Sequence, residues 1–238
     1  MITETLTLPV KQFTSSLRLI STSYSFRCDA KYADSDFISL EKKIRKAGLF
    51  ELGEFLPTPL IKGSQPVSLD QPTDDSVPVV NTLSIQNLSI READCRHITR
   101  DDYDNLSDDR KLKINDVLLT VDGGTSIGKA ALFSFDTEFT VDSHVSILRP
   151  SHISPLALVY LLASPLGQMQ FKRAESGASG QTTVTEDDIR RFIFPVSILN
   201  DLEAVVTNAE IERKRIAQER EKLDTQEKEL WSQIGTLS

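Results

Sequence analysis

The chain has 238 residues, which is enough for one domain of ordinary size with an appendage or for two small domains. Its 39% hydrophobic residues are typical of a globular protein, and no apolar run approaches the roughly 18 residues of a membrane span. The formal net charge of −8 argues against strong DNA binding by this chain alone, so phosphate contacts would need local basic residues or charge from a partner.

The first residues and the cysteines indicate the compartment. Residues 1–6 lack the basic start and apolar core of a secretory signal. Cys28 and Cys95 are the only cysteines, and without an export signal we expect free thiols in a reducing compartment. The sequence therefore predicts a cytoplasmic protein.

The first part of the chain is expected to contain two short strands and one helix. Segments 17–20 and 24–26 are β-prone. Asp34 or Ser35 can cap a helix over 37–47, which a glycine ends. The basic residues of this helix lie mostly off its apolar stripe and indicate a solvated face; a phosphate-contacting helix is the alternative.

The next part is expected to be mostly irregular. Residues 49–76 are rich in proline and predict loops. A strand is expected over 77–81, and a short helix near 101–106 within a densely charged segment.

A glycine-rich turn then separates two predicted strands. The strands are the apolar runs 116–121 and 130–135, and the turn is 123–129. The turn matches the first seven positions of a phosphate-binding P-loop, but Ala130 stands where that loop needs Ser or Thr to hold Mg²⁺. No helix is expected after it to receive a phosphate. We therefore predict a tight turn and not a nucleotide site.

Residues 140–150 alternate between apolar and polar, which predicts one half-buried strand. Ser154 and Pro155 begin a helix, with serine as the cap and proline at the first helical position. A second serine–proline pair, Ser164 and Pro165, breaks this helix and begins another.

The block closes with a polar loop, a short helix and a strand. The loop covers 175–183, Thr185 caps the helix, and residues 192–196 form the strand. Acidic residues in the first turn of this helix suit the helix dipole and indicate no catalytic role.

Five segments between residues 115 and 196, in this order and at these spacings, resemble the target-recognition domain of type I restriction–modification specificity subunits. They read NDVLLTVDGGTSIGKAALF, VDSHVSILRP, LVYLLASPLGQMQF, SGASGQTTVTEDDI and FIFPV, with weaker likeness at 26–29 and 77–80. The resemblance implies an α+β recognition domain over residues 1–198 that binds double-stranded DNA without a cofactor and is not an enzyme. It implies a separate adenine-N6 DNA methyltransferase subunit as partner, with a restriction subunit as a further candidate.

Residues 199–238 differ from the rest of the chain. No glycine or proline interrupts 201–234, which predicts one helix about 50 Å long at 1.5 Å per residue. Every seventh residue is apolar, while the second seam position is mostly polar, so the pattern is half that of a coiled coil. We expect this helix to form a homodimer through Leu202, Ala209, Ile216, Leu223 and Leu230. Full-length relatives resemble two recognition domains joined by two such helices, so the sequence looks like a half-length form.

The polar loop is the best candidate for contacting DNA. It carries small polar residues and a glutamine, whose amide can pair bidentately with adenine in the major groove. Two basic residues just upstream can contact phosphates or guanine. The predicted DNA-binding set is Lys172, Arg173, Ser176, Gly177, Ser179, Gln181, Thr182 and Thr183, together with Thr125, Ser126 and Lys129 of the glycine-rich turn.

No metal site or catalytic constellation is expected. His97, His144 and His152 are scattered without other ligands at metal-binding spacing; His144 is expected to be structural, with a base-facing role as the alternative. The chain lacks an Asn/Asp-Pro-Pro-Tyr/Phe motif to grip a flipped adenine, so methyl transfer would belong to another subunit. Two other hypotheses remain: an interaction module with a coiled-coil arm, or the detached recognition half of a fused methyltransferase-nuclease.

Overall fold

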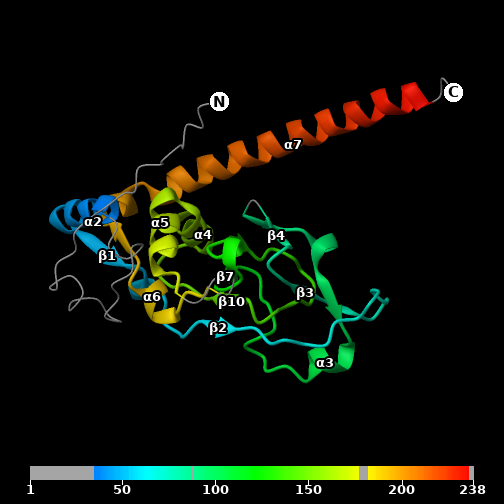
Figure 1. Cartoon of the computed structure of the whole chain (residues 1–238), viewed down its shortest axis with the longest axis horizontal. Helices are drawn as coiled ribbons and strands as arrows, with labels where there is room; N and C mark the ends of the chain where they lie inside the picture. Colours follow the sequence, from blue (N-terminus) through cyan, green and yellow to red (C-terminus); the bar gives the residue numbers. More distant parts are fainter. Residues whose placement is uncertain (1–34, 87, 177–181, 236–238) are drawn as a thin grey trace, which may run out of the picture.

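The computed structural model describes residues 35–86, 88–176 and 182–235. Figure 1 shows a body of small sheets and short helices from which one long helix, α7, projects. The predicted α+β class and the long C-terminal helix are confirmed. Among the described residues, no helix combines the length and the apolar character that crossing a membrane demands.

A four-stranded antiparallel sheet forms the centre of the body, and both of its faces are buried. Its strands, in spatial order, are β2 (Ile61–Lys62), β10 (Val145–Leu148), β7 (Val117–Thr120) and β8 (Ala130–Leu132). Side chains alternate along a strand, so Val117 and Leu119 join the cluster on one face and Leu118 joins the cluster on the other. The predicted strands at 116–121 and 130–135 are therefore confirmed, although the second is shorter than predicted.

Two consecutive helices, α4 (Pro155–Ala163) and α5 (Pro165–Ala174), lie beside this sheet, and α4 covers one of its faces. The predicted break between them is confirmed. The hydroxyl of Ser154 accepts the N–H of Ala157, and that of Ser164 accepts the N–H of Gly167. Each helix thus begins with its own serine cap and a proline that supplies no amide hydrogen.

The other face of the central sheet packs against a second, three-stranded sheet. In this sheet β3 (Val77–Val80) lies between antiparallel β6 (Arg96–Ile98) and parallel β9 (Thr140–Val141), and α3 (Arg100–Asp104) follows β6. The prediction of one half-buried strand over 140–150 is wrong. A turn at 142–144 divides this segment into β9 and β10, which belong to different sheets. All four residues of β10 are buried because neighbouring elements cover both faces.

A short strand near residue 50 pairs with the strand at the end of the segment 115–196. β1 (Leu49–Glu51) pairs antiparallel with β11 (Ile193–Pro195), and α2 (Ser35–Ala47) packs on β11. The predicted helix over 37–47 is confirmed, and Gly48 ends it at φ +95°. The sequence missed β1, which lies at the start of the segment predicted to be loop. The predicted strands at 17–20 and 24–26 lie outside the described residues.

The remaining elements are short. They are β4 (Ile85–Gln86), β5 (Ser89–Ile90), α6 (Glu186–Arg190) and 3-10 helices at Leu52–Phe55, Glu92–Asp94, Gly124–Ser126 and Val196–Asn200. β4 and β5 form a small hairpin that packs over β8. The predicted cap of α6 is confirmed, because Thr185 and Asp188 form a reciprocal capping box.

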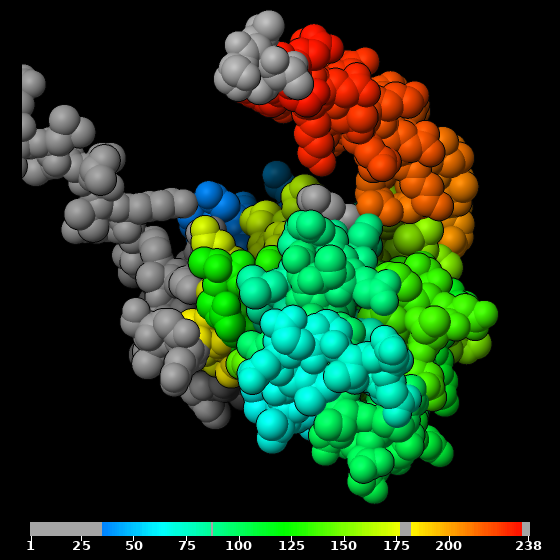
Figure 2. Space-filling model, turned by 90° about the vertical axis from the view of Figure 1, so that its right-hand side faces the viewer, coloured from blue at the N-terminus to red at the C-terminus, as the bar shows by residue number. Residues whose placement is uncertain are grey.

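Helix α7 (Leu202–Gly235) touches the body through its first turns. Leu202 and Val206 are 5% and 2% exposed and belong to the main core cluster. Figure 2 shows the orange first turns against the body and the red end clear of it. Leu202 must therefore be removed from the residues predicted to bind a partner, because its own domain already covers it. Ala209 is half-buried, whereas the three later residues of the predicted stripe are exposed.

Cys95 is a free thiol, as predicted. Burial raises its pKa to about 11, which keeps the sulfur protonated at neutral pH. It is therefore expected to be unreactive. Cys28 lies outside the described residues.

Candidate nucleic-acid interface

The glycine-rich turn at 123–129 is a tight connection between β7 and β8, as predicted. Gly128 has φ +83°, and a Cβ atom there would lie 2.8 Å from the ring of Phe171. The side-chain amide of Gln168 donates to the carbonyl oxygen of Gly128 at 2.9 Å, which fastens the turn to α5. β8 begins at Ala130, so no helix follows the turn to receive a phosphate.

The polar loop closes beside this turn. Ser176 and Thr183 exchange two backbone hydrogen bonds of 3.0 and 2.9 Å and form the base of the loop. The Thr183 hydroxyl donates to the carbonyl oxygen of Val121 at 3.2 Å, and the Val184 N–H donates to the same oxygen at 2.9 Å. Asp122 forms an antiparallel bridge with Thr183. The base of the loop is thus tied to the end of β7, directly before the glycine-rich turn.

The structure places part of the predicted DNA-binding set together. Thr125 is exposed on the turn, and Ser126 and Thr182 are half-buried. The other predicted residues of the loop, Gly177, Ser179 and Gln181, lie outside the described residues.

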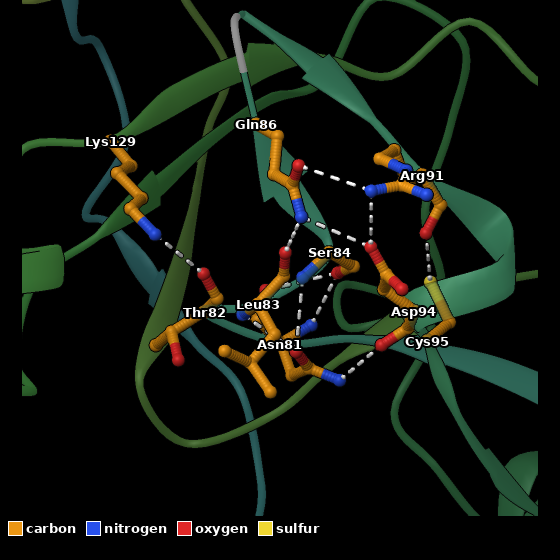
Figure 3. A network of polar contacts seen from close by, with 9 residues as sticks. All are labelled: Asn81, Thr82, Leu83, Ser84, Gln86, Arg91, Asp94, Cys95 and Lys129. Carbon is orange, nitrogen blue, oxygen red and sulfur yellow. Dashed lines mark hydrogen bonds and ion pairs between the residues drawn. The ribbon is translucent and has the colours of Figure 1, made fainter.

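Lys129 is held by a loop that the sequence did not single out. Its ammonium group donates to the carbonyl oxygen of Thr82 at 3.1 Å (Figure 3). The side-chain oxygen of Asn81 accepts the N–H groups of Leu83 and Ser84 at 2.8 and 3.1 Å, and Asn81 is 4% exposed. This is an Asx turn, so an asparagine before short polar residues was the available sequence signal. The turn leaves Leu83 67% exposed next to the base of the β4–β5 hairpin.

The two basic residues before the loop have different environments. Lys172 is exposed, as a phosphate contact would require. The Arg173 side chain is only 15% exposed. Its guanidinium lies 3.2 Å from a carboxylate oxygen of Glu41 and 4.4 Å from the ring centroid of Phe37. Arg173 therefore fastens α2 to α5, which does not favour the predicted contact with phosphate or guanine.

A histidine–carboxylate contact lies at the same edge of the sheet. A carboxylate oxygen of Asp122 contacts Nδ1 of His144, and the other lies 3.7 Å from the ammonium group of Lys62. The backbone N–H of His144 donates to the Asp142 carboxylate at 2.9 Å. Burial raises the pKa of Asp142, and this hydrogen bond opposes part of the rise. The His144 side chain remains 46% exposed.

These groups form one surface, which we call the polar rim: the turn 123–129, the loop base at Ser176 and Thr183, and the Asp122, His144 and Lys62 cluster. The turn and the loop are predicted from the sequence, but their contact through Asp122 is not. Asp122 and His144 are 22 positions apart, and pairing of β7 with β10 brings them together. Within the described residues, no group of three or more His, Cys, Asp or Glu could hold a metal ion.

A cavity of about 630 Å³ lies along the edge strand β2 and shares Lys62 with the polar rim. Its lining includes Arg110, Arg149, Lys62 and residues 57–61. Arg149 forms two hydrogen bonds of 2.8 and 2.9 Å with the buried carboxylate of Asp116. This pairing raises the pKa of Arg149 and offsets its positive charge.

Solved structures of restriction–modification proteins are similar to most of this chain. One, from work on complex assembly and conformational transition of the type I R-M system, is 16% identical with a TM-score of 0.48; the match covers 77% of this chain and 43% of that chain. The S subunit from M. genitalium is 14% identical with a TM-score of 0.49, over 72% of this chain and 40% of that one. The HsdS subunit from Thermoanaerobacter tengcongensis is 13% identical with a TM-score of 0.48, over 76% and 45%. This chain thus spans less than half the length of each. No protein-family model matches the chain, and no curated protein matches it.

Proposed function

We propose that this chain is the DNA-recognition subunit of a type I-like restriction–modification system. The observation that carries the proposal is the polar rim, where two loops separated by about 50 positions in the sequence are tied to one end of a rigid sheet. Hydroxyl, amide and amine groups of the kind predicted for these loops contact base edges and phosphates in DNA complexes. The resemblance of segments 115–196 to target-recognition domains also supports a role in DNA recognition.

The proposal assigns the chemistry to a partner. The net charge of −8 implies weak binding of DNA by this chain alone, so the partner supplies much of the phosphate-binding charge. That partner is a separate adenine-N6 methyltransferase in a cytoplasmic assembly, with a restriction subunit as a further candidate. On this view the chain is not an enzyme and selects the site of methylation.

Reconstitution tests this proposal. The chain is mixed with a candidate adenine-N6 DNA methyltransferase from the same genome, and methylated positions are mapped on DNA of random sequence. We expect methylation at one defined site, and only when both proteins are present. Methylation without this chain, or at sites that do not depend on it, would refute the proposal.

The second candidate function is an interaction module, and the far end of α7 favours it. Ile216, Leu223 and Leu230 are 43%, 63% and 61% exposed along one stripe of the helix. Exposed leucines in such a stripe indicate a partner surface. We propose that this partner is a second copy of the chain, which is compatible with DNA recognition. Co-purification with proteins but no sequence-dependent DNA binding would favour the interaction module alone.

A further inference from the structure

His144 lies in the polar rim, and its side chain is exposed enough for a ligand to reach it. Asp122, which contacts its imidazole, forms the bridge with Thr183 that ties the base of the polar loop to the end of β7. The backbone of His144 is fixed as well, because its N–H donates to Asp142 and its carbonyl oxygen accepts the N–H of Val121 at 3.0 Å. The ring is therefore oriented by neighbours from β7 and β10 while 46% of the side chain faces solvent.

The contact with Asp122 sets the tautomer of the ring. A carboxylate only accepts hydrogen bonds, so the neutral imidazole carries its proton on Nδ1 and a lone pair on Nε2. Among the described residues, none forms a hydrogen bond with Nε2. In this tautomer the rim presents a hydrogen-bond acceptor at Nε2.

The charges around the ring favour a neutral donor as its ligand. Asp122 and Asp142 face His144, and Lys62 offsets one of these two carboxylates. A phosphate would be repelled by the remaining negative charge, whereas an amino group would be attracted. In the major groove, the exocyclic amines of adenine and cytosine are such donors, and guanine presents acceptors there.

We propose that His144 contacts one base of the DNA target, accepting a hydrogen bond through Nε2 from the exocyclic amine of adenine or cytosine. Asp122 is a positioning residue that holds the proton on Nδ1. The inference rests on the proposed function and adds a specificity-determining residue outside the two loops.

Selection from a library of randomised DNA duplexes, using the full-length chain assembled with the methyltransferase, tests the role of His144. The unmodified chain is expected to select adenine or cytosine at one position, and His144→Ala to weaken that preference by roughly tenfold while other positions stay selected. His152→Asn is the matched control, because His152 is exposed outside the rim and asparagine tolerates its φ of 61°. It should leave the selected sequence unchanged.

A second variant tests the tautomer. The amide of Asp122→Asn can donate to Nδ1, which moves the ring proton to Nε2 and turns the acceptor into a donor. The preference at the same position should then shift towards guanine.

The outcomes separate the inference from the proposed function. If the assembled complex with the unmodified chain selects no sequence, both are overturned. If it selects a sequence that His144→Ala also selects with equal strength, the inference alone fails. A uniform loss at every position in His144→Ala also overturns it, since that result indicates a role in stability and not in contacting one base.

Discussion

At the scale of single residues, the buried ion pair between Asp116 and Arg149 shows how a polar group can hold the body together. Asp116 is 3% exposed and accepts two hydrogen bonds from Arg149 and one from the N–H of Lys113. We predict that Asp116→Ala lowers the free energy of unfolding by roughly 2–4 kcal/mol, because Arg149 and Lys113 lose their acceptor. Urea denaturation measures this loss.

The control is an exposed pair. Arg215 lies 2.7 Å from Glu219 on α7, and both side chains are more than half exposed. Arg215→Ala should change the free energy of unfolding by less than about 0.5 kcal/mol. Equal losses in the two variants would contradict the role assigned to Asp116.

Lys172 and Arg173 are neighbours with opposite expected effects. We predict that Lys172→Ala weakens DNA binding by the assembled complex for all sequences alike and reduces the salt slope of log K by about 0.9, the value for one phosphate contact. Arg173→Ala should leave the slope unchanged and lower stability, because its guanidinium binds Glu41 and Phe37. Binding titrations between low and moderate salt distinguish them; the reverse result would restore Arg173 as the DNA contact.

Gln181 carries the prediction that specificity resides in the polar loop. Gln181→Ala should cost about 1–3 kcal/mol in binding the target and relax the preference at one base pair, as the loss of one bidentate contact does. Thr125→Ala on the neighbouring turn serves as a comparison, and its effect should be smaller because one hydroxyl makes fewer contacts. Competition binding with single-base variants of the target measures both. Wild-type discrimination by Gln181→Ala would show that the loop does not provide it.

At the scale of elements, three polar contacts between α7 and the body, with one ion pair inside the helix, set the direction in which α7 leaves the body. The Tyr160 hydroxyl donates to Glu210 at 3.0 Å, and Arg213 bonds both to Glu210 at 2.7 Å and to Ser89 in the β4–β5 hairpin at 3.0 Å. The Ser154 hydroxyl donates to Glu203 at 2.8 Å. Together with the buried Leu202 and Val206, these contacts hold the first three turns of the helix on α4 and the hairpin.

We predict that α7 remains helical in Glu210→Ala but samples a wider range of angles relative to the body. Distances between spin labels on the body and near the end of α7 should spread in this variant and stay narrow in the control Glu219→Ala. Hydrogen bonds from Arg213, and then from Tyr160, hold the pKa of Glu210 below its ordinary value of 4.5. The stabilisation of the α7 orientation by ionised Glu210 is thus complete above pH 4.5 and is lost as the pH falls through the lowered pKa. Acid should therefore also broaden the distance distribution of the unmodified chain. Narrow distances in Glu210→Ala would show that the apolar contacts alone suffice.

The elements that sequence analysis predicted correctly carry their signals locally. The caps at Ser154, Ser164 and Thr185 form hydrogen bonds within three residues. Helix α7 is predicted from its own uninterrupted sequence, without reference to the elements that pack on it. Two of the errors involve pairing with distant parts of the chain. β1 has only three residues and is a strand because β11, more than 140 positions later, pairs with it. The split between β9 and β10 depends on two different sheets, which the alternation of residues 140–150 does not reveal.

The same reason limited prediction of the candidate site. Loop composition identified the turn 123–129 and the loop after Arg173, but the ring of Phe37 and the carboxylate of Glu41 were needed to assign Arg173 to packing. His144 could not be distinguished from a structural histidine until strand pairing placed it beside Asp122.

At the scale of the whole molecule, the exposed stripe on α7 predicts a dimer. Ile216, Leu223 and Leu230 lie beyond the turns that the body covers, so they are free to meet a second helix. We predict a dimer at micromolar concentration by sedimentation, and a folded monomer when Leu223→Glu introduces a charge into the seam. Lys228→Glu changes a charge on the opposite side of the helix from the stripe and should remain dimeric. A monomeric unmodified chain would contradict the proposal.

Antiparallel pairing of two such helices would place two identical recognition bodies at opposite ends of the dimer. Bodies related by a twofold axis must bind identical half-sites in inverted orientation, so the target should be an interrupted palindrome. Inserting seven residues into the exposed part of α7 lengthens the paired helices by about 10.5 Å, which corresponds to roughly three base pairs of DNA. We therefore predict that this insertion lengthens the preferred spacer by about three base pairs and leaves both half-sites unchanged, as measured by mapping methylation with the assembled complex. An unchanged spacer would show that α7 does not set the distance between the bodies, and a non-palindromic target would exclude the symmetric dimer.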